Sequence, residues 1–233
     1  LLRSSRVVAK SVKKLLVLIT LLLPAAVFAH GVAQGDARFI ESVNGLQLVP
    51  YLYLGAKHMV TGYDHLLFLA GVIFFLYRLK DVALYVSLFA LGHSLTLLLG
   101  VLGGLRVNPY AVDAVIGLSV VYKAFENVGG FRSLGVNPDP RWAVLLFGLV
   151  HGFGLSTKLQ DLHLSQDALV PNMIAFNVGV ELGQFTALAL ILLAFTWWRQ
   201  STSFLGRAFL TNMALMTAGF VLCGYQLAGL ALS

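Results

Sequence analysis

The sequence predicts an all-α fold: a polytopic membrane bundle of six transmembrane helices that follows an N-terminal signal peptide. Composition is the first reason, because 58% of the 233 residues are hydrophobic, only 11% are charged, and the mean hydropathy is +0.85. Such values are typical of an integral membrane protein. The second reason is that the apolar residues fall into long segments separated by short links rich in turn-forming residues, as membrane-spanning helices do.

The first element in the chain is the predicted signal peptide, residues 1–29. A basic start precedes the apolar run Leu15–Leu23, which is followed by Pro24 and by small residues up to Ala29. This order is typical of a secretory signal with a cleavage site, and we expect cleavage after Ala29. An uncleaved anchor helix is the alternative. Residues 30–50 are polar and contain glycine, so we expect an extracytoplasmic lead-in there.

Residues 51–233 make up the predicted transmembrane domain, and no separate soluble domain fits between its segments. The links hold most of the turn formers, such as Gly103-Gly104, Asn108-Pro109 and Gly129-Gly130, which end helices or begin new ones. The six apolar segments are expected at residues 52–77, 82–103, 109–129, 141–158, 171–197 and 207–230.

The distribution of charge excludes a nucleic-acid partner and predicts how the helices are oriented in the membrane. The net charge is +6, but five of the sixteen bases lie in the signal peptide, which leaves eleven bases against ten acids and no basic patch for a nucleic acid. With the N-terminus outside, six bases fall on inner links and chiefly Arg106 and Lys158 on outer ones, which is the positive-inside pattern. We therefore expect both termini outside a bacterial inner membrane. The inner bases are Arg78, Lys80, Arg132, Arg141, Arg199 and Arg207.

Polar side chains inside the apolar segments indicate a functional site, because ionisable groups are costly in a bilayer. The segments run in alternate directions, so four of them bring such groups to a common depth in the outer half. A further pair, Lys123 and Glu126, lies three residues apart near an inner end and is expected to pair. The candidate site residues are His58, Asp64, His65, His93, His151 and Glu181, with Thr61, Ser94, Thr96, Asn177 and Gln184 in support.

The stretch from His58 to His65 raises a geometric question. On one straight helix these histidines lie about 10 Å apart along the axis, too far to bind one ion together. Gly62 lies between them and could let the helix break or begin late. Without such a break, His58 is either a gate to the site or an interfacial residue.

Four histidines and two carboxylates from four segments suit a metal site. Imidazole suits zinc, nickel, copper and iron, and a carboxylate completes the ligand shell or orients a ligand imidazole through its second nitrogen. We therefore expect a divalent transition metal as the ligand. Glycines flank the site as Gly92-His93 and His151-Gly152-Phe153-Gly154, and their expected role is close helix packing.

Ordered motifs in these segments resemble those of the HupE/UreJ proteins, in particular the second branch of that family. His58, Asp64 and His65 match the first-segment pattern His-x5-Asp-His. The fourth segment differs from the founding permeases, which carry two histidines there, since it has His151 alone and the glutamate appears one segment later as Glu181. The other matching stretches are Gly92–Thr96, Leu118–Tyr122 with Glu126-Asn127, His151–Gly154 and Phe176–Glu181.

This resemblance implies a small polytopic membrane protein of hydrogenase and urease gene clusters, regarded as a nickel or cobalt permease. In that interpretation His58 and Asp64 capture the ion, and Glu181 helps to pass it inward, where Glu126 and Asn127 offer the polar steps. Its partners are the membrane lipid and the metal ion, and a role in assembling a metalloenzyme is a further possibility.

An intramembrane zinc-dependent hydrolase acting on a lipid or lipid-linked substrate is the alternative. Three histidines and a water molecule form a common catalytic zinc shell, and Asp64 or Glu181 would then serve as general base. A tight three-histidine site without an inner polar path would favour the enzyme.

Overall fold

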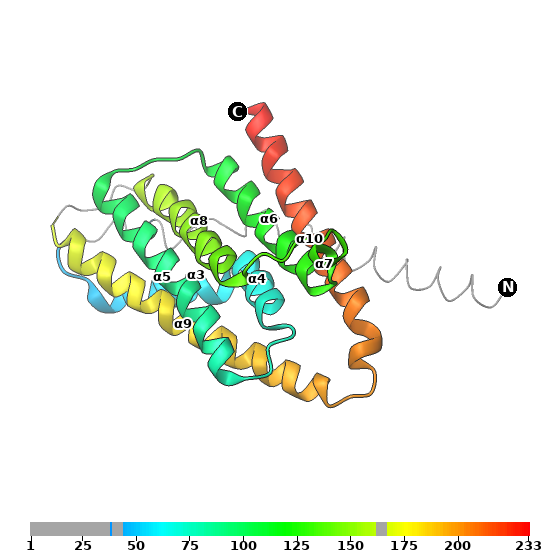
Figure 1. The fold of residues 1–233 in the computed structure, drawn as a ribbon. Helices are drawn as coiled ribbons and strands as arrows, with labels where there is room; N and C mark the ends of the chain where they lie inside the picture. The colour runs from blue at the N-terminus through cyan, green and yellow to red at the C-terminus, as the bar shows by residue number, and fades with distance from the viewer. Residues whose placement is uncertain (1–37, 39–43, 162–166) are drawn as a thin grey trace.

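The computed structural model describes residues 38, 44–161 and 167–233. The predicted signal peptide and most of the lead-in lie outside these residues. The described part of the chain folds into helices and contains no strand (Figure 1). Its helices are α3 (Leu48–Thr61), α4 (Tyr63–Ile73), α5 (Leu79–Gly103), α6 (Pro109–Asn127), α7 (Gly130–Ser133), α8 (Pro140–Gln160), α9 (Leu169–Arg199) and α10 (Phe204–Leu232).

Four of the described helices, α5, α8, α9 and α10, are long and apolar enough to cross a membrane. The predicted first segment, 52–77, is divided at Gly62 into α3 and the short apolar helix α4. The predicted third segment corresponds to α6, which carries Asp113, Lys123 and Glu126 within its 19 residues. The all-helical membrane fold is therefore shown, and the count of six spans stays a prediction.

A polar residue followed by proline begins two of the helices. The side chain of Asn108 accepts a hydrogen bond from the backbone of Ala111 ahead of α6, and Pro109 occupies the first turn. Asp139 likewise accepts from the backbone of Arg141 ahead of α8, which starts at Pro140. A polar N-cap followed by proline satisfies donors that a helix start leaves unpaired.

The helices pack as three close pairs, α3 with α9, α5 with α8 and α6 with α10. Each pair has glycine at its contact: a Cβ added at Gly92 would lie 2.6 Å from the carbonyl oxygen of Leu145, and one at Gly117 would lie 2.6 Å from the backbone nitrogen of Cys223. A Cβ at Gly179 would clash with the Leu52 carbonyl. The glycines thus allow backbone to approach backbone, as in membrane helix pairs.

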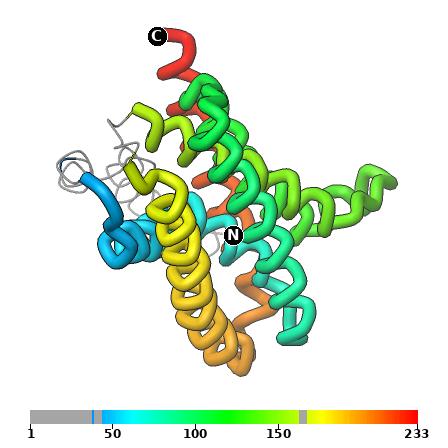
Figure 2. Tube along the Cα trace, turned by 90° about the vertical axis from the view of Figure 1, so that its left-hand side faces the viewer, coloured from blue at the N-terminus to red at the C-terminus, as the bar shows by residue number. Residues whose placement is uncertain are grey.

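The pairs differ in direction. The residue numbers of the contacts between α5 and α8 increase together along both helices, from Phe89 beside Gly148 to Gly100 beside Ser156. These two helices are therefore parallel. The residue numbers of the contacts between α3 and α9 also increase together, so this pair is parallel as well. Along α6 and α10 the numbers run oppositely, and the helices are antiparallel. In Figures 1 and 2 the last turns of α10 extend beyond the other helices.

The short helix α4 lies among α5, α6, α9 and α10. Its C-terminal carbonyls are capped by Arg199 of α9, which donates to the oxygens of Ile73 and Phe74. Asn127 of α6 donates to the Gly71 oxygen at 2.8 Å. Polar side chains from two neighbouring helices therefore fix the position of α4, whose N-terminal turn carries Asp64 and His65.

The outward faces of the helices are apolar. On α5, Leu91, Leu95 and Leu99 are 61%, 50% and 53% exposed, while His93 on the opposite face is 1% exposed. Spacing by four residues places the three leucines on one face of the helix. This distribution, apolar outside and polar inside, is the reverse of a soluble helix and indicates contact with lipid.

Candidate metal centre

A break in the helix at Gly62 shapes the site. Gly62 has φ −73° and ψ 99°, and its nitrogen donates to the His58 oxygen as the last bond of α3. Its own carbonyl then accepts from Leu66, 3.1 Å away, in the first turn of α4. A Cβ at this position would lie 2.8 Å from Nδ1 of His65. With the helix broken at Gly62, His58 joins the site, and the ring centroids of His58 and His65 lie 5.2 Å apart.

His65 is the centre of a cluster of imidazole rings. Its ring centroid lies 5.0 Å from that of His151 on α8 and 5.8 Å from that of His93 on α5. His65, His93 and His151 are each 1% exposed, whereas His58 is partly exposed. Four helices, α3, α4, α5 and α8, thus bring one histidine each to the same place in the bundle.

Two of these histidines and the neighbouring Asp64 form a group that could hold a metal ion. Asp64, His65 and His151 each offer a ligand atom, all within 4.8 Å of one another, and all three residues are buried. Ligand atoms that bind one tetrahedral ion with bonds of about 2.1 Å are about 3.4 Å apart. The three ligand atoms, which lie up to 4.8 Å from one another, would therefore move closer together to bind one ion.

The surroundings set which imidazole nitrogens can bind metal. Nδ1 of His151 lies 2.7 Å from the carbonyl oxygen of Phe147, so this nitrogen carries the proton and Nε2 keeps its lone pair. Nδ1 of His65 lies 3.1 Å from Oδ2 of Asp64. In the described part of the chain, neither ring nitrogen of His93 has a hydrogen-bond partner. An imidazole such as that of His151, with one nitrogen held by a hydrogen bond and the other open, is suited to bind a transition metal.

A comparison with sequence models of protein families gives a match. The sequence model of the HupE / UreJ protein family matches residues 34–233. The chain belongs to the HupE/UreJ family. No curated protein and no solved structure matches it. The HupE/UreJ family is associated with nickel and cobalt transport, so membership connects the buried histidine and aspartate group with metal handling, without showing which metal is bound.

The predicted supporting residues Thr61, Ser94 and Thr96 have different surroundings in this HupE/UreJ protein. Thr61 is exposed and donates to the Lys57 oxygen at 2.8 Å. Ser94 is partly buried beside His93, and its hydroxyl has no hydrogen-bond partner in the part of the chain described. Thr96 donates across to the Leu149 oxygen at 2.7 Å and so joins α5 to α8.

The three predicted residues on α9 have separate surroundings. Gln184 donates to the Val86 oxygen at 3.2 Å and joins α9 to α5. Asn177 is buried, and Glu181, one turn later, is partly exposed. Glu181 is not among the three residues whose ligand atoms lie within 4.8 Å of one another. The geometry thus assigns Thr96 and Gln184 to helix packing and leaves Glu181 outside the group.

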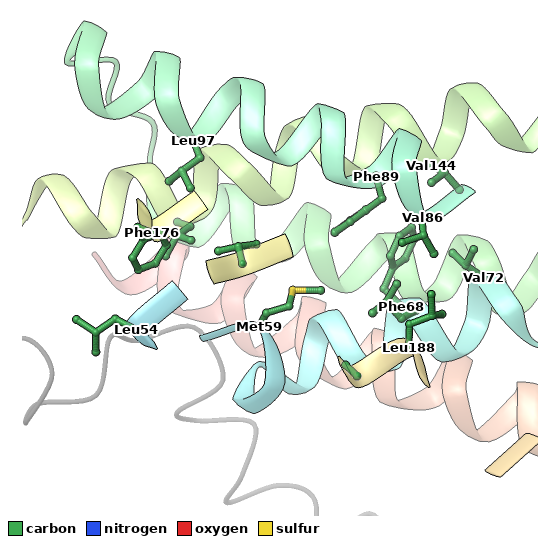
Figure 3. Close-up of a cluster of buried hydrophobic side chains, with 14 of the residues drawn as sticks. Leu54, Met59, Phe68, Val72, Val86, Phe89, Leu97, Val144, Phe176 and Leu188 are labelled. Atoms are coloured by element: carbon green, nitrogen blue, oxygen red, sulfur yellow. The ribbon is translucent and has the colours of Figure 1, made fainter. Parts of the chain in front are cut away.

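A layer of phenylalanine rings adjoins the histidines and was not anticipated from the sequence. Phe68 lies 5.2 Å from Phe89 and 5.9 Å from Phe147, measured between ring centroids. Phe89 and Phe68 contact His151 at 5.0 and 5.5 Å. The close-up in Figure 3 shows Phe68 and Phe89 together with Val72 and Val86. Spacing by three or four residues from each histidine is the sequence signal that could have revealed this layer.

Three ion pairs of the described residues lie outside the histidine cluster, and one of them, between Arg106 and Asp161, is exposed. Lys123 and Glu126 pair at 3.0 Å, which confirms the expected contact on α6. Lys158 of α8 pairs with Asp113 of α6 at 2.7 Å. This last pair was not predicted, because its partners come from different segments and nothing in a sequence reveals their mutual rotation. Asp113 is not a member of the group formed by Asp64, His65 and His151.

Proposed function

We propose that this chain is a divalent-metal permease that carries nickel or cobalt across a bacterial inner membrane. The observation that carries the proposal is the buried group of Asp64, His65 and His151, whose ligand atoms lie within 4.8 Å of one another. The group lies in a membrane protein of a family associated with metal transport. An ion would exchange water for imidazole and carboxylate ligands there.

A topology of six spans, with both termini outside, is part of this proposal. In that arrangement the first, third and fifth spans run inward and the others outward. The parallel pairs α3 with α9 and α5 with α8, and the antiparallel pair α6 with α10, support this order. The first span would then be the broken helix formed by α3 and α4.

Each site residue has a role in the proposed pathway. His58, partly exposed at the end of α3, and Asp64 capture the ion from the outer side. His65, His93 and His151 hold it. Asn177 and Glu181 on α9 are polar groups for the step that follows, and transfer of the metal to a metalloenzyme assembly partner is compatible with the same route.

Beyond the histidines the route meets the phenylalanine layer, and beyond that layer lies a polar cavity of about 320 Å³ lined by Glu126 and Asn127. Glu126 is paired with Lys123, and the Asn127 amide donates to Gly71 and Asn212. Inward passage therefore requires the phenylalanine rings to separate and these contacts to change.

The same layer is the observation that favours a second function, an intramembrane zinc-dependent hydrolase of lipid or lipid-linked substrates. Phe68, Phe89 and Phe147 close the site on one side, as the floor of an active site does. His65, His93 and His151 would hold the zinc ion, which supplies Lewis acidity and lowers the pKa of a bound water. Asp64 or Glu181 would accept a proton from that water.

Transport and metal content together test the two functions. Purified protein is reconstituted in vesicles that contain a metal-sensitive dye, and nickel, cobalt and zinc are added outside. We expect nickel or cobalt entry that His65→Ala reduces at least tenfold and that Thr61→Ala, at the exposed threonine of the same helix break, leaves unchanged. Absence of entry, together with one tightly bound zinc per chain, would overturn the permease and support the hydrolase.

A further inference from the structure

A second site lies at the end of α4 opposite the histidine cluster. It is a half-open cavity of about 320 Å³ between the ends of α4, α5, α6 and α7. Val72, which lines it, is seven residues beyond His65 and so about 10 Å further along α4. The volume falls within the range of small-ligand sites, about 300 to 1,000 Å³. Its lining is Val72, Phe75, Leu76, Tyr85, Lys123, Glu126, Asn127, Gly129 and Arg132.

The charges of this lining favour an anion over a metal ion. Lys123 is only 7% exposed, and its ammonium lies 3.0 Å from Oε2 of Glu126, so that carboxylate is already neutralised. Arg132 adds a second cation without a second acid in the lining. Just outside the lining, Arg141 and Asp139 act on Tyr85 with opposite charges. The lining therefore carries one excess positive charge, which favours a bound anion and disfavours a bound divalent cation; a metal ion on the proposed inward route would pass through this cavity without being held there.

The N–H donors of Lys123 and Arg132 favour an anion that has several oxygen atoms. An ammonium has three N–H donors, of which the contact with Glu126 uses one. The guanidinium of Arg132, exposed on α7, offers a planar fork that matches phosphate. Asn127 contributes its carbonyl oxygen only, because its amide nitrogen donates to Gly71 and Asn212.

The apolar part of the lining suggests where the phosphate comes from. Val72, Phe75 and Leu76 form one wall, and Phe75 is 36% exposed. The cavity lies at the helix ends that the positive-inside pattern places on the cytoplasmic side, where basic pockets between membrane helices bind the headgroups of anionic lipids. Lipid and free phosphate share the same binding chemistry, and both probes enter the test.

We propose that Lys123 and Arg132 bind a phosphate group in this cavity, with an anionic phospholipid headgroup as its source. This site is separate from the histidine cluster and does not depend on the permease proposal. It also bears on α4, because the Lys123 side chain packs on Gly71: a Cβ there would lie 3.2 Å from Cγ of Lys123.

The test uses the full chain purified in neutral detergent and metal-free buffer, with Tm as the readout. A short-chain phosphatidylglycerol, inorganic phosphate, and chloride at equal ionic strength are titrated. We expect phosphatidylglycerol to raise Tm, since a ligand of the folded state stabilises it. A rise with inorganic phosphate as well shows that the phosphate group alone suffices; a rise with phosphatidylglycerol alone shows that the lipid is needed.

Substitutions then locate the site. Arg132→Gln should weaken binding about tenfold or more, the effect of losing a charge-assisted hydrogen bond. Lys80→Gln is the matched control, because Lys80 is an exposed base near the same end of α5 and does not line the cavity. Glu126→Gln should tighten binding, since it frees Lys123 for the ligand. No rise in Tm with either probe, an equal loss in the Lys80 and Arg132 variants, or weaker binding in the Glu126 variant would overturn the proposal.

Discussion

The rings of His58 and His65 lie 5.2 Å apart between centroids, although seven positions along a straight helix span about 10 Å. The helix break at Gly62 accounts for the difference, because it ends α3 and begins α4 at a new angle. The approach of the two imidazoles therefore depends on a residue without a side chain, which lies directly against His65.

The first prediction tests that dependence. Gly62→Ala places a Cβ 2.8 Å from Nδ1 of His65 and 3.2 Å from Oδ1 of Asp64, and alanine also favours a continuous helix by about 1 kcal/mol. We expect metal affinity to fall about 10- to 100-fold, the effect of disturbing groups that orient a ligand. Titration calorimetry with nickel measures it.

The matched control for this substitution is Gly206→Ala, where a Cβ meets nothing within 4 Å. It should leave nickel affinity unchanged and raise stability slightly, by up to about 1 kcal/mol, through helix propensity. Equal nickel affinity in both variants would show that the break does not shape the site.

Several features of the fold follow from local sequence patterns. The helix starts at Asn108-Pro109 and Asp139-Pro140 and the pair of Lys123 and Glu126 depend on residues near one another in the chain, and the small size of Gly92 and Gly152 indicates close packing without naming the partner helix. Turn chemistry, residue size and helical spacing decide such features, so a single sequence predicts them.

Contacts between helices depend on the rotation of each helix about its axis, which packing decides. Thr96 and Gln184 look like site residues in the sequence because they are polar and intramembrane, yet each donates to a backbone carbonyl of another helix. Asp113 of α6 pairs with Lys158 of α8, a contact that also depends on how the two helices are rotated. The phenylalanine layer was missed because its rings look like ordinary core residues until three helices are brought together.

The second prediction ranks the histidines. His65→Ala and His151→Ala remove members of the group whose ligand atoms lie within 4.8 Å and should each lower metal affinity by more than about 100-fold, beyond the range for groups that only orient a ligand. His93→Ala, outside that group, should cost less. Metal content after dialysis against graded chelator concentrations checks the order, and a His93 variant that loses the most metal would contradict it.

The third prediction concerns the interface between α5 and α8. A Cβ at Gly152 would clash with the hydroxyl of Thr96 and the carbonyl of His93, so Gly152→Ala should lower stability by about 1 to 3 kcal/mol through overpacking. Thermal unfolding in detergent measures the loss. Gly154→Ala is the control, because its nearest neighbours would be side-chain atoms of Val112 and Ile116 at 3.2 and 3.3 Å; a larger loss there would contradict the assignment.

The fourth prediction tests the phenylalanine layer as the barrier between the metal site and the inner cavity. Phe68 is 1% exposed and contacts Phe89, Phe147 and His151, and it supplies no ligand atom. Phe68→Ala removes the ring that joins the layer, so nickel entry into vesicles should rise several-fold while nickel affinity stays within about threefold. Stability should fall by about 3 to 5 kcal/mol, as for other buried phenylalanines.

Phe204→Ala separates the barrier from a general loosening of the bundle. Phe204 is 3% exposed and packs with Phe74 in a second apolar cluster, where their rings stack at 5.6 Å. The two substitutions remove the same ring from comparable burial, so they should cost similar stability, but only the Phe68 variant should speed nickel entry. If both variants speed entry equally, the rise reflects leakage through a weakened bundle and the barrier is refuted. If the wild-type protein admits no nickel and neither variant changes this, the layer is instead the closed floor that the hydrolase requires.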